Sequence, residues 1–399
     1  TGEEFQPEQS EEAATREVYL DWNATTPPAP GVQDAVMDAM ELYGNPSSIH
    51  RPGVDSRKAI DTARRRLADA LHTTSRRIVF TGGGSEANNL AIKGIALSPE
   101  NNKRHIITST IEHPAVTAAC NWLEGRGFTV TRLPVDGQGL VSPESLKDAI
   151  DEHTCLVTVM LANNETGVIQ PVKELAAIAR SRGALFHTDA VQAFGKIPVD
   201  VEDLGVDMPT VSAHKIRGPR GMGALYVGRG LPIEPLVHGG GQEHGLRSGT
   251  ENIAAIAGFG KAVELIHDSL EDSARMEELR NMLQNGITSL VEEGVVNGKG
   301  APRLPNTVNV TLPGFRGESV VLSMSRYGVY FSSGSACSSA SSAPSAALLA
   351  MGLSEEAAHC SLRLSLGPTI TADDITYTLE RLEETLNSSR KIVHFVPCR

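Results

Sequence analysis

The stretch 211–218, Val-Ser-Ala-His-Lys-Ile-Arg-Gly, ends an apolar strand with Lys215 on a short polar turn. Upstream, the stretch 186–192, Phe-His-Thr-Asp-Ala-Val-Gln, ends a second apolar strand with Asp189. Most lysines at strand ends are solvated surface charges, so Lys215 alone is weak evidence for a site. Lys215 becomes stronger evidence for a site if polar residues also follow the other strands of the same sheet.

Apolar, β-branched segments alternate with helical patterns through much of the chain. The helical pattern at 55–72 is typical, because its apolar residues recur every three or four positions on one face. This alternation predicts an α/β fold with a mostly parallel sheet covered by helices on both sides. In such sheets ligands bind at the carboxyl ends of the strands. The predicted strands are 77–81, 105–109, 128–134, 155–161, 184–188, 208–212 and 223–227.

After Thr250 the pattern changes, and a chain of 399 residues is long enough for two unequal lobes. Residues 253–290 predict one long helix leading to a C-terminal lobe with strands at 307–311 and 319–323 and a helix at 372–386. We therefore expect a large domain and a smaller α+β domain. The predicted divisions are a disordered tail at 1–17, a large domain at 31–265, and a small domain formed by 18–30 and 266–399.

Charge and cysteine content restrict the class of protein. The formal net charge of −12 argues against nucleic acid or an anionic membrane as a main partner. No apolar segment approaches the roughly 20 residues that span a bilayer. The five cysteines include no Cys-x-x-Cys pair, which argues against a disulfide framework and a zinc site and for a reducing, cytoplasmic location. They are Cys120, Cys155, Cys337, Cys360 and Cys398.

Lys215 and Asp189 are the two kinds of group that pyridoxal phosphate (PLP) requires of a protein. A lysine amine forms a Schiff base with this cofactor, and an aspartate pairs with its protonated ring nitrogen. An aspartate directly after a buried strand is costly unless a cation compensates it. Gln192, three residues further on, is suited to bond the phenolic oxygen of the ring. A structural salt bridge or a helix cap is the alternative role for Asp189.

Three further strand ends carry candidate residues. The run 81–86, Thr-Gly-Gly-Gly-Ser-Glu, joins a strand to a helix and suits a phosphate, although such runs are also simple tight turns. His113 is suited to stack on a flat ring and to shuttle protons, or it is a helix-start histidine held by local hydrogen bonds. Asn164 is suited to orient a carboxylate or phenolate, or the Asn-Asn pair only forms a turn.

Cys337 lies in the run 332–340, Ser-Ser-Gly-Ser-Ala-Cys-Ser-Ser-Ala, where no neighbour in sequence would bury it. A thiol exposed on a loop is a liability unless it is used, whereas buried cysteines are usually inert. We therefore predict that Cys337 is reactive. Cys120, Cys155 and Cys360 are predicted to be packed, and Cys398 to be incidental.

With these residues in place, the chain resembles the cysteine desulfurases and their close relatives the selenocysteine lyases, PLP enzymes of the aspartate-aminotransferase-like fold. The matching runs occur in family order over nearly the whole chain. They are 19–27, 44–48, 80–89, 112–113, 162–167, 187–192, 212–218, 238–243, 247–252 and 332–339.

The resemblance implies a role for each candidate residue. Lys215 would hold PLP and remove the substrate proton, and Cys337 would be the nucleophile that receives sulfur as a persulfide. Asn164 and Arg363 would bind the substrate carboxylate, and Asn23 would border that site. The remaining cofactor contacts would be His113 on the ring, Asp189 on its nitrogen, Gln192 on its phenolic oxygen, Gly84, Ser85, Ser212 and His214 on the phosphate, and Thr250 from the neighbouring subunit of a homodimer.

Some positions depart from the usual family pattern. Ser85 replaces a frequent threonine but keeps the hydroxyl, and Cys360 replaces a common serine beside the strand of Arg363. The stretch 391–399 does not resemble the usual ending, so no partner contact is assigned to it.

The predicted function is conversion of L-cysteine to L-alanine, with transfer of the persulfide to an acceptor protein, for example an iron–sulfur scaffold. A selenocysteine lyase uses nearly the same residues, although the long serine-rich run around Cys337 favours cysteine. A plain aminotransferase would need no loop cysteine. A non-catalytic scaffold would need neither Lys215 nor Cys337.

Overall fold

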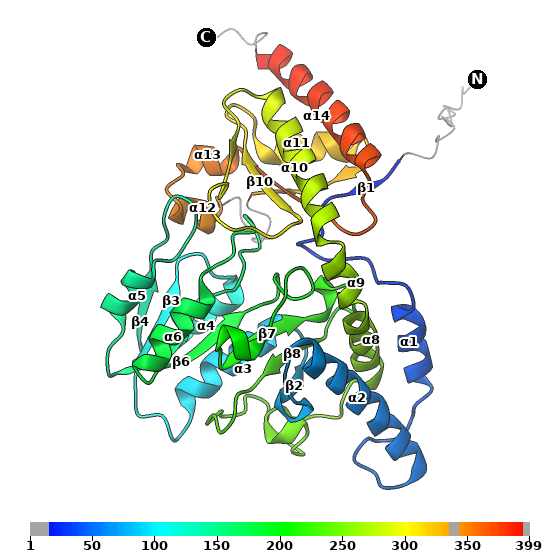
Figure 1. Ribbon diagram of the computed structural model, residues 1–399, viewed down its shortest axis with the longest axis vertical. Helices are drawn as coiled ribbons and strands as arrows, with labels where there is room; N and C mark the ends of the chain where they lie inside the picture. The colour runs from blue at the N-terminus through cyan, green and yellow to red at the C-terminus, as the bar shows by residue number, and fades with distance from the viewer. Residues whose placement is uncertain (1–15, 335–342, 394–399) are drawn as a thin grey trace, which may run out of the picture.

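The computed structural model describes residues 16–334 and 343–393. The first fifteen residues of the predicted tail, together with Cys337 and Cys398, lie outside the described residues. Within them the chain forms two layered parts, one around the sheet in the lower half of Figure 1 and one around β10 and the long C-terminal helix above it. No helix in the described ranges is both long and apolar enough to cross a membrane.

The lower part is built on a seven-stranded sheet of order β2-β8-β7-β6-β5-β3-β4 in the described residues. All neighbouring pairs are parallel except the two that involve β8, which runs antiparallel to β2 and β7. The predicted α/β fold with a mostly parallel sheet is confirmed. The strands are β2 (Ile78–Thr81), β3 (His105–Ser109), β4 (Thr129–Leu133), β5 (Thr154–Thr158), β6 (Leu185–Asp189), β7 (Met208–Ser212) and β8 (Gly223–Tyr226).

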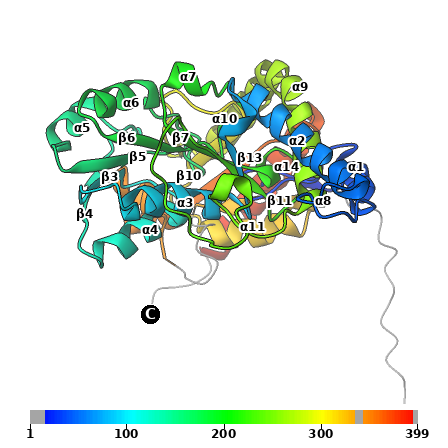
Figure 2. The same ribbon diagram turned by 90° about the horizontal axis from the view of Figure 1, so that it is seen from below.

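Helices cover both faces of this sheet because successive strand residues point to opposite sides. Ile106 packs into the core under α3 and α4, and its neighbour Ile107 packs into the core under α2, α6 and α8. Figure 2 shows the sheet between these two layers. The helices of this part are α1 (Val32–Met40), α2 (Arg51–Ala70), α3 (Gly84–Leu97), α4 (Pro114–Glu124), α5 (Pro143–Ala149), α6 (Val172–Ser181), α7 (Val201–Leu204) and α8 (Ile253–Glu264), with 3₁₀ turns η1 (Ser75–Arg77), η2 (Ala213–Lys215) and η3 (Glu243–Gly245).

The upper part has its own core, in which Val18 and Leu20 from the N-terminal segment pack with residues of α10, β10 and β13. Strand β13 lies between β10 and β12, β9 pairs with the other edge of β10, and β1 pairs with β11. Its elements are β1 (Val18–Tyr19), α9 (Ile266–Glu271), α10 (Ser273–Leu290), β9 (Val295–Val296), β10 (Thr307–Thr311), α11 (Gly317–Ser325), β11 (Val329–Tyr330), β12 (Ser332–Ser333), α12 (Ala346–Ala350), α13 (Glu355–His359), β13 (Ser361–Ser365) and α14 (Ala372–Val393).

Two predicted elements were wrong. The single helix at 253–290 is three helices, α8, α9 and α10, which are separated at Leu265 and Asp272. The predicted strand at 319–323 lies inside α11, whose residues Gly317, Val320 and Met324 are buried at helical spacing. The other predicted strands and the C-terminal helix are present, with ends that differ by a few residues.

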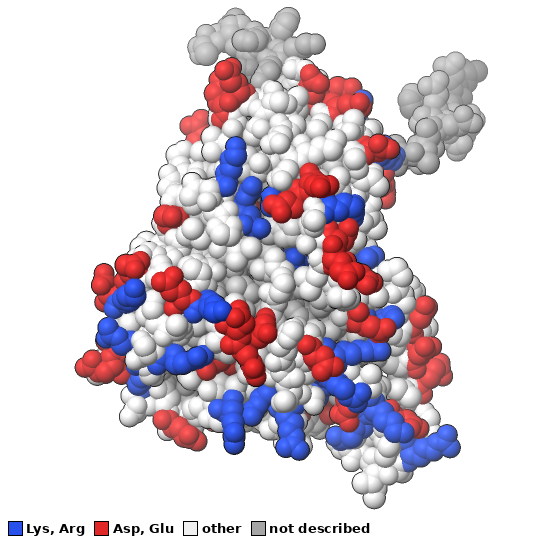
Figure 3. Space-filling model, in the orientation of Figure 1, with Lys and Arg blue, Asp and Glu red and all other residues white. Residues whose placement is uncertain are grey.

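The charged surface in Figure 3 carries lysine and arginine interspersed with aspartate and glutamate on the face shown. One ion pair, by contrast, is buried against the edge strand β2. Arg64 of α2 donates to both carboxylate oxygens of Glu243 at 2.6 and 2.7 Å, and Glu243 also accepts from the Phe80 backbone N–H at 2.8 Å. This pair therefore connects α2, β2 and η3.

Replacing Glu243 with glutamine is expected to lower the free energy of unfolding by about 3 kcal/mol, because Arg64 would keep a buried charge without its counterion. Urea denaturation of the two proteins measures the difference. Asp203→Asn is the matched control, because its partner Lys173 is exposed and such pairs contribute less than about 1 kcal/mol. Equal losses in the two variants would contradict the prediction.

Candidate active site

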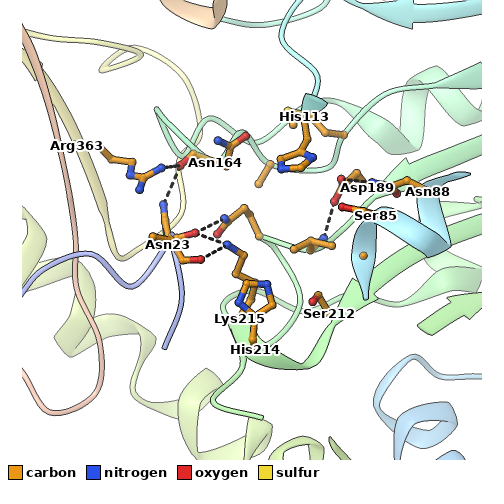
Figure 4. A pocket seen from close by; sticks show the side chains of 16 residues that line it. Asn23, Ser85, Asn88, His113, Asn164, Asp189, Ser212, His214, Lys215 and Arg363 are labelled. Carbon is orange, nitrogen blue, oxygen red and sulfur yellow. Dashed lines mark hydrogen bonds between the residues drawn. The ribbon is translucent and has the colours of Figure 1, made fainter. Parts of the chain in front are cut away.

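A cavity of about 330 Å³ opens at the carboxyl ends of β5, β6 and β7, between the two parts of the molecule. In Figure 4, Asp189, Asn88 and Ser85 lie on one side of the cavity and Arg363 and Asn23 on the other, with Lys215 and His113 between them. The lining residues are Asn23, Ala24, Gly84, Ser85, Asn88, His113, Met160, Ala162, Asn164, Asp189, Val191, Gln192, Ser212, His214, Lys215 and Arg363.

The cavity brings together every predicted site residue in the described ranges except Thr250. Thr250 is exposed in the loop before α8 and does not line the cavity of its own chain. Its role in the site of a neighbouring subunit stays a prediction, as does the role of Cys337, which lies outside the described residues.

Lys215 ends the 3₁₀ turn η2 that follows β7. Its Nζ donates to the carbonyl oxygens of Asn23 at 2.5 Å and Ala24 at 2.7 Å. The amine is therefore drawn toward the N-terminal segment that borders the cavity, as Figure 4 shows. Lys215 therefore lines the cavity with its amine hydrogen-bonded, unlike a solvated surface lysine.

Asp189 is the last residue of β6 and is 6% exposed. It accepts hydrogen bonds from Asn88 Nδ2 at 2.7 Å and from the Val191 backbone N–H at 3.0 Å. Asp189 forms no salt bridge among the described residues. The structural salt bridge considered as its alternative role is therefore not found in this part of the chain. A buried carboxylate held only by neutral donors is well suited to a cationic ligand atom.

Asn88 was missed by the sequence analysis. It lies on the buried side of α3, and its Oδ1 is buried without a hydrogen-bond partner among the described residues. The sequence feature that could have identified Asn88 is a polar residue at a core position of a helix, four residues after Gly84. Its side chain fixes the orientation of the Asp189 carboxylate.

His113 caps the N-terminus of α4, and its Nδ1 accepts from the Ala115 backbone N–H at 3.1 Å. His113 is therefore a helix-start histidine held by a local hydrogen bond, as one alternative predicted, but its ring also lines the cavity. Because Nδ1 is an acceptor, the neutral ring carries its proton on Nε2. Burial lowers the pKa of His113, Asp189 opposes that shift and Lys215 adds to it. The neutral imidazole therefore predominates near pH 7.

Glu112, next to His113, was not assigned a role by the sequence analysis. It is buried and accepts from Ser109 Oγ at 2.5 Å and from the Met160 backbone N–H at 3.0 and 3.1 Å. Burial raises the pKa of Glu112 to about 8. The carboxyl group ties the end of β3 to the segment after β5 and so fixes the backbone from which His113 projects.

An anion cradle lies where β2 turns into α3. Gly83 precedes the helix with a φ of 141°, and no side chain caps the first helical N–H groups. A Cβ on Gly84 would lie 2.9 Å from Val191 Cγ2, so glycine is needed there for close packing. Helix N-termini with open N–H groups bind phosphate. The hydroxyls of Ser85 and Ser212 line the same cavity.

His214 also borders this cradle. Its Nδ1 lies 3.2 Å from Thr25 Oγ1. Burial lowers the pKa of His214 to about 4, and the charges of Lys215 and then Arg220 contribute. At neutral pH the ring is therefore uncharged and carries a single N–H.

Arg363 of β13 is 2% exposed and defines the opposite end of the cavity. Its Nη2 donates to Asp21 Oδ1 at 2.8 Å and to Ser332 Oγ at 3.2 Å, and its Nη1 donates to the Asn164 carbonyl oxygen at 3.3 Å. Within the described ranges its Nε is buried with no hydrogen-bond partner. A buried, unsatisfied guanidinium N–H beside a cavity is a donor available to a carboxylate.

The fold and this site define an enzyme of the aspartate-aminotransferase-like class. Comparison with known families agrees, because residues 18–378 match the model of the aminotransferase class-V family. The chain belongs to that family.

Relatives within the family are named as cysteine desulfurases. The chain is 46% identical to "Cysteine desulfurase IscS" of Dictyoglomus turgidum over 94% of this chain and 96% of that one. It is 47% identical to the protein of the same name from Methanosarcina thermophila over 95% and 94% of the two chains. Among solved structures, a "NifS-like protein" superposes with a TM-score of 0.87 at 38% identity, covering 94% of this chain and 100% of that chain.

Proposed function

We propose that the protein is a PLP-dependent cysteine desulfurase that converts L-cysteine to L-alanine and forms a persulfide on Cys337. The observation that carries the proposal is the placement of Lys215 between two opposite ends of one cavity. Among the described residues, Asp189 is buried without a cationic partner at one end, and the Nε–H of Arg363 has no hydrogen-bond partner at the other. The similarity to named cysteine desulfurases supports it.

The donor set of the cavity fits PLP. The N-terminus of α3, with Gly84, Ser85, Ser212 and His214, would hold the phosphate, and Lys215 would hold the aldehyde carbon. Asp189 would pair with the ring nitrogen, Gln192 would bond the phenolic oxygen, and His113 would stack on the ring. Bound there, PLP supplies an electron sink for the bonds around the substrate Cα.

The residues of this chain then have separate tasks. Arg363 and Asn164, with Asn23 at the border, bind the substrate carboxylate and so orient the Cα–H bond. Lys215 Nζ takes the Cα proton as a general base. The Cys337 thiolate forms a bond to the substrate sulfur as the Cβ–S bond breaks, and the electron pair left on the carbon skeleton takes up a proton to give alanine.

Alanine release from L-cysteine and from L-selenocysteine by the PLP-loaded protein tests the activity. We expect alanine from cysteine together with protein-bound persulfide. Alanine from selenocysteine alone would assign the protein as a selenocysteine lyase. Keto-acid formation without alanine would assign it as an aminotransferase.

Replacing Arg363 with lysine is expected to raise KM for L-cysteine by about 10- to 100-fold, because lysine keeps the charge but loses the planar set of N–H donors. Steady-state alanine formation over a range of cysteine concentrations measures the change. An unchanged KM would remove Arg363 from carboxylate binding. Arg381→Lys is the matched control, because the Arg381 guanidinium packs over Tyr327 and Tyr377 and does not line the cavity.

The sulfur on Cys337 would pass to an acceptor protein such as an iron–sulfur scaffold. We further propose a homodimer in which Thr250 contacts the cofactor of the neighbouring subunit. A cytoplasmic location accords with the free thiols of Cys120, Cys155 and Cys360, which are all buried. Light scattering of the holoenzyme tests the dimer.

A further inference from the structure

Lys196 is a second lysine near the cavity, and the mechanism above does not use it. It follows β6 by seven residues and lines a smaller cavity of about 60 Å³ behind the site. Its Nζ donates to Gln192 Oε1 at 2.7 Å and to Asn23 Oδ1 at 2.8 Å. Burial, followed by the charges of Lys215 and Arg363, lowers its pKa well below the ordinary lysine value. An amine this costly to bury needs a compensating role.

The contact with Lys196 decides which end of the Gln192 amide faces which neighbour. Gln192 Oε1 accepts from Lys196, and Gln192 Nε2 donates to the Asn23 carbonyl oxygen at 2.9 Å. The flipped amide would remove the oxygen that accepts from Lys196 and would set Gln192 Oε1 against the Asn23 carbonyl oxygen, two acceptors together. The amide is therefore held with its N–H₂ group as the end available to a ligand.

Asn23 is held by the same amine. Its Oδ1 accepts from Lys196 and, at 3.3 Å, from Asn306 Nδ2. Its Nδ2 is thereby directed to the Asn164 carbonyl oxygen and to Thr307 Oγ1. Lys196 thus joins Gln192, on the cofactor side of the cavity, to Asn23, whose carbonyl oxygen accepts from Lys215.

We propose that Lys196 is a positioning residue that fixes the Gln192 amide as a hydrogen-bond donor to the phenolic oxygen of PLP. The inference rests on the proposed function, because it presumes that PLP binds in the cavity. Lys196 acts through Gln192 and does not itself contact the cofactor. A donor at the phenolic oxygen stabilises its anionic form and lowers the pH at which bound PLP changes its absorbance.

Lys196→Met tests this role, because methionine fills similar space and donates no hydrogen bond. The expected result is a rise of about half a unit to one unit in the apparent pKa of bound PLP, measured by absorbance. PLP should also bind about three- to tenfold more weakly, measured by equilibrium dialysis. Gln192→Leu should produce shifts of similar size.

The double variant Lys196→Met, Gln192→Leu distinguishes positioning from a purely structural role. If Lys196 acts through Gln192, the double variant shows no larger pKa shift than Gln192→Leu alone. Additive shifts, or no shift in Lys196→Met, would overturn the inference.

Lys103→Met is the matched control. Lys103 also makes two hydrogen bonds, to the carbonyl oxygens of Thr154 and Gly183 at 3.0 Å, but it does not line the cavity. The Lys103→Met substitution should lower the melting temperature of the cofactor-free protein without changing the apparent pKa of bound PLP. Failure of the wild-type protein to bind PLP would refute the proposed function instead, and this outcome is visible before any variant is compared.

Discussion

Alanine formation from L-cysteine is expected to fall at least about 10⁴-fold in kcat/KM when Lys215 is replaced by alanine. A positioned general base contributes roughly 10²- to 10⁴-fold, and loss of the covalent attachment of the cofactor adds to this. No other described lysine lines the cavity, and the Lys196 amine is committed to Gln192 and Asn23. No neighbouring amine in the described residues is therefore placed to replace Lys215. Initial rates with saturating PLP measure the loss.

The same variant should still bind PLP, because the α3 N-terminus, Asp189 and His113 do not depend on Lys215. Binding should become reversible on dilution, and the absorbance of the lysine-bound cofactor should be missing. Lys173→Ala is the control, because Lys173 pairs with Asp203 on the surface. A Lys215→Ala protein that retains one per cent or more of kcat/KM would exclude Lys215 as the base.

The central sheet was predictable because most of its strands are short runs buried on both faces between helical stretches; the edge strand β4, with Thr129 and Arg132 exposed, is the exception. The prediction of a strand at 319–323 was wrong because five residues are too few to distinguish the two-residue period of a strand from the 3.6-residue period of a helix. The spacing that marks α11 as a helix joins Gly317, Val320 and Met324, and it extends beyond that window. The break at Asp272 has no glycine or proline to mark it. Its ion pair with Arg275 at 2.6 Å becomes visible only in the structure.

Most of the site residues found from sequence pattern lie at strand ends, where chain order places them at one edge of the sheet, whereas Asn23 and Arg363 were assigned only through the family resemblance. Asn88, Glu112 and Lys196 were not found, because each hydrogen-bonds to a partner from another element. Asn88 donates to Asp189, 101 residues away, and Lys196 donates to Asn23, 173 residues away, as well as to Gln192. A polar residue in an apolar stretch signals some buried contact, but the identity of the partner depends on the tertiary fold.

The described residues on either side of the segment that contains Cys337 are held near Arg363 and Asn164, the residues proposed to bind the substrate carboxylate. Before it, the Gly334 N–H donates to the carbonyl oxygen of Ser361, in the same strand as Arg363. After it, Ser345 caps α12 and donates its hydroxyl to Glu165, the neighbour of Asn164. The sequence between these two anchors therefore starts and finishes next to the position proposed for the substrate.

Replacing Cys337 with alanine is accordingly expected to abolish persulfide formation and to lower alanine release from L-cysteine at least about 10³-fold, because the nucleophile is lost. PLP content and the absorbance change on adding cysteine should persist, because Lys215, Asp189 and Arg363 are intact. Alanine analysis and mass spectrometry of the protein measure the two products. Cys360→Ala is the matched control, because Cys360 is 7% exposed and precedes β13. Full activity in Cys337→Ala would mean that sulfur leaves without a protein thiolate, and an equal loss in Cys360→Ala would mean that packing around β13, and not the nucleophile, limits the reaction.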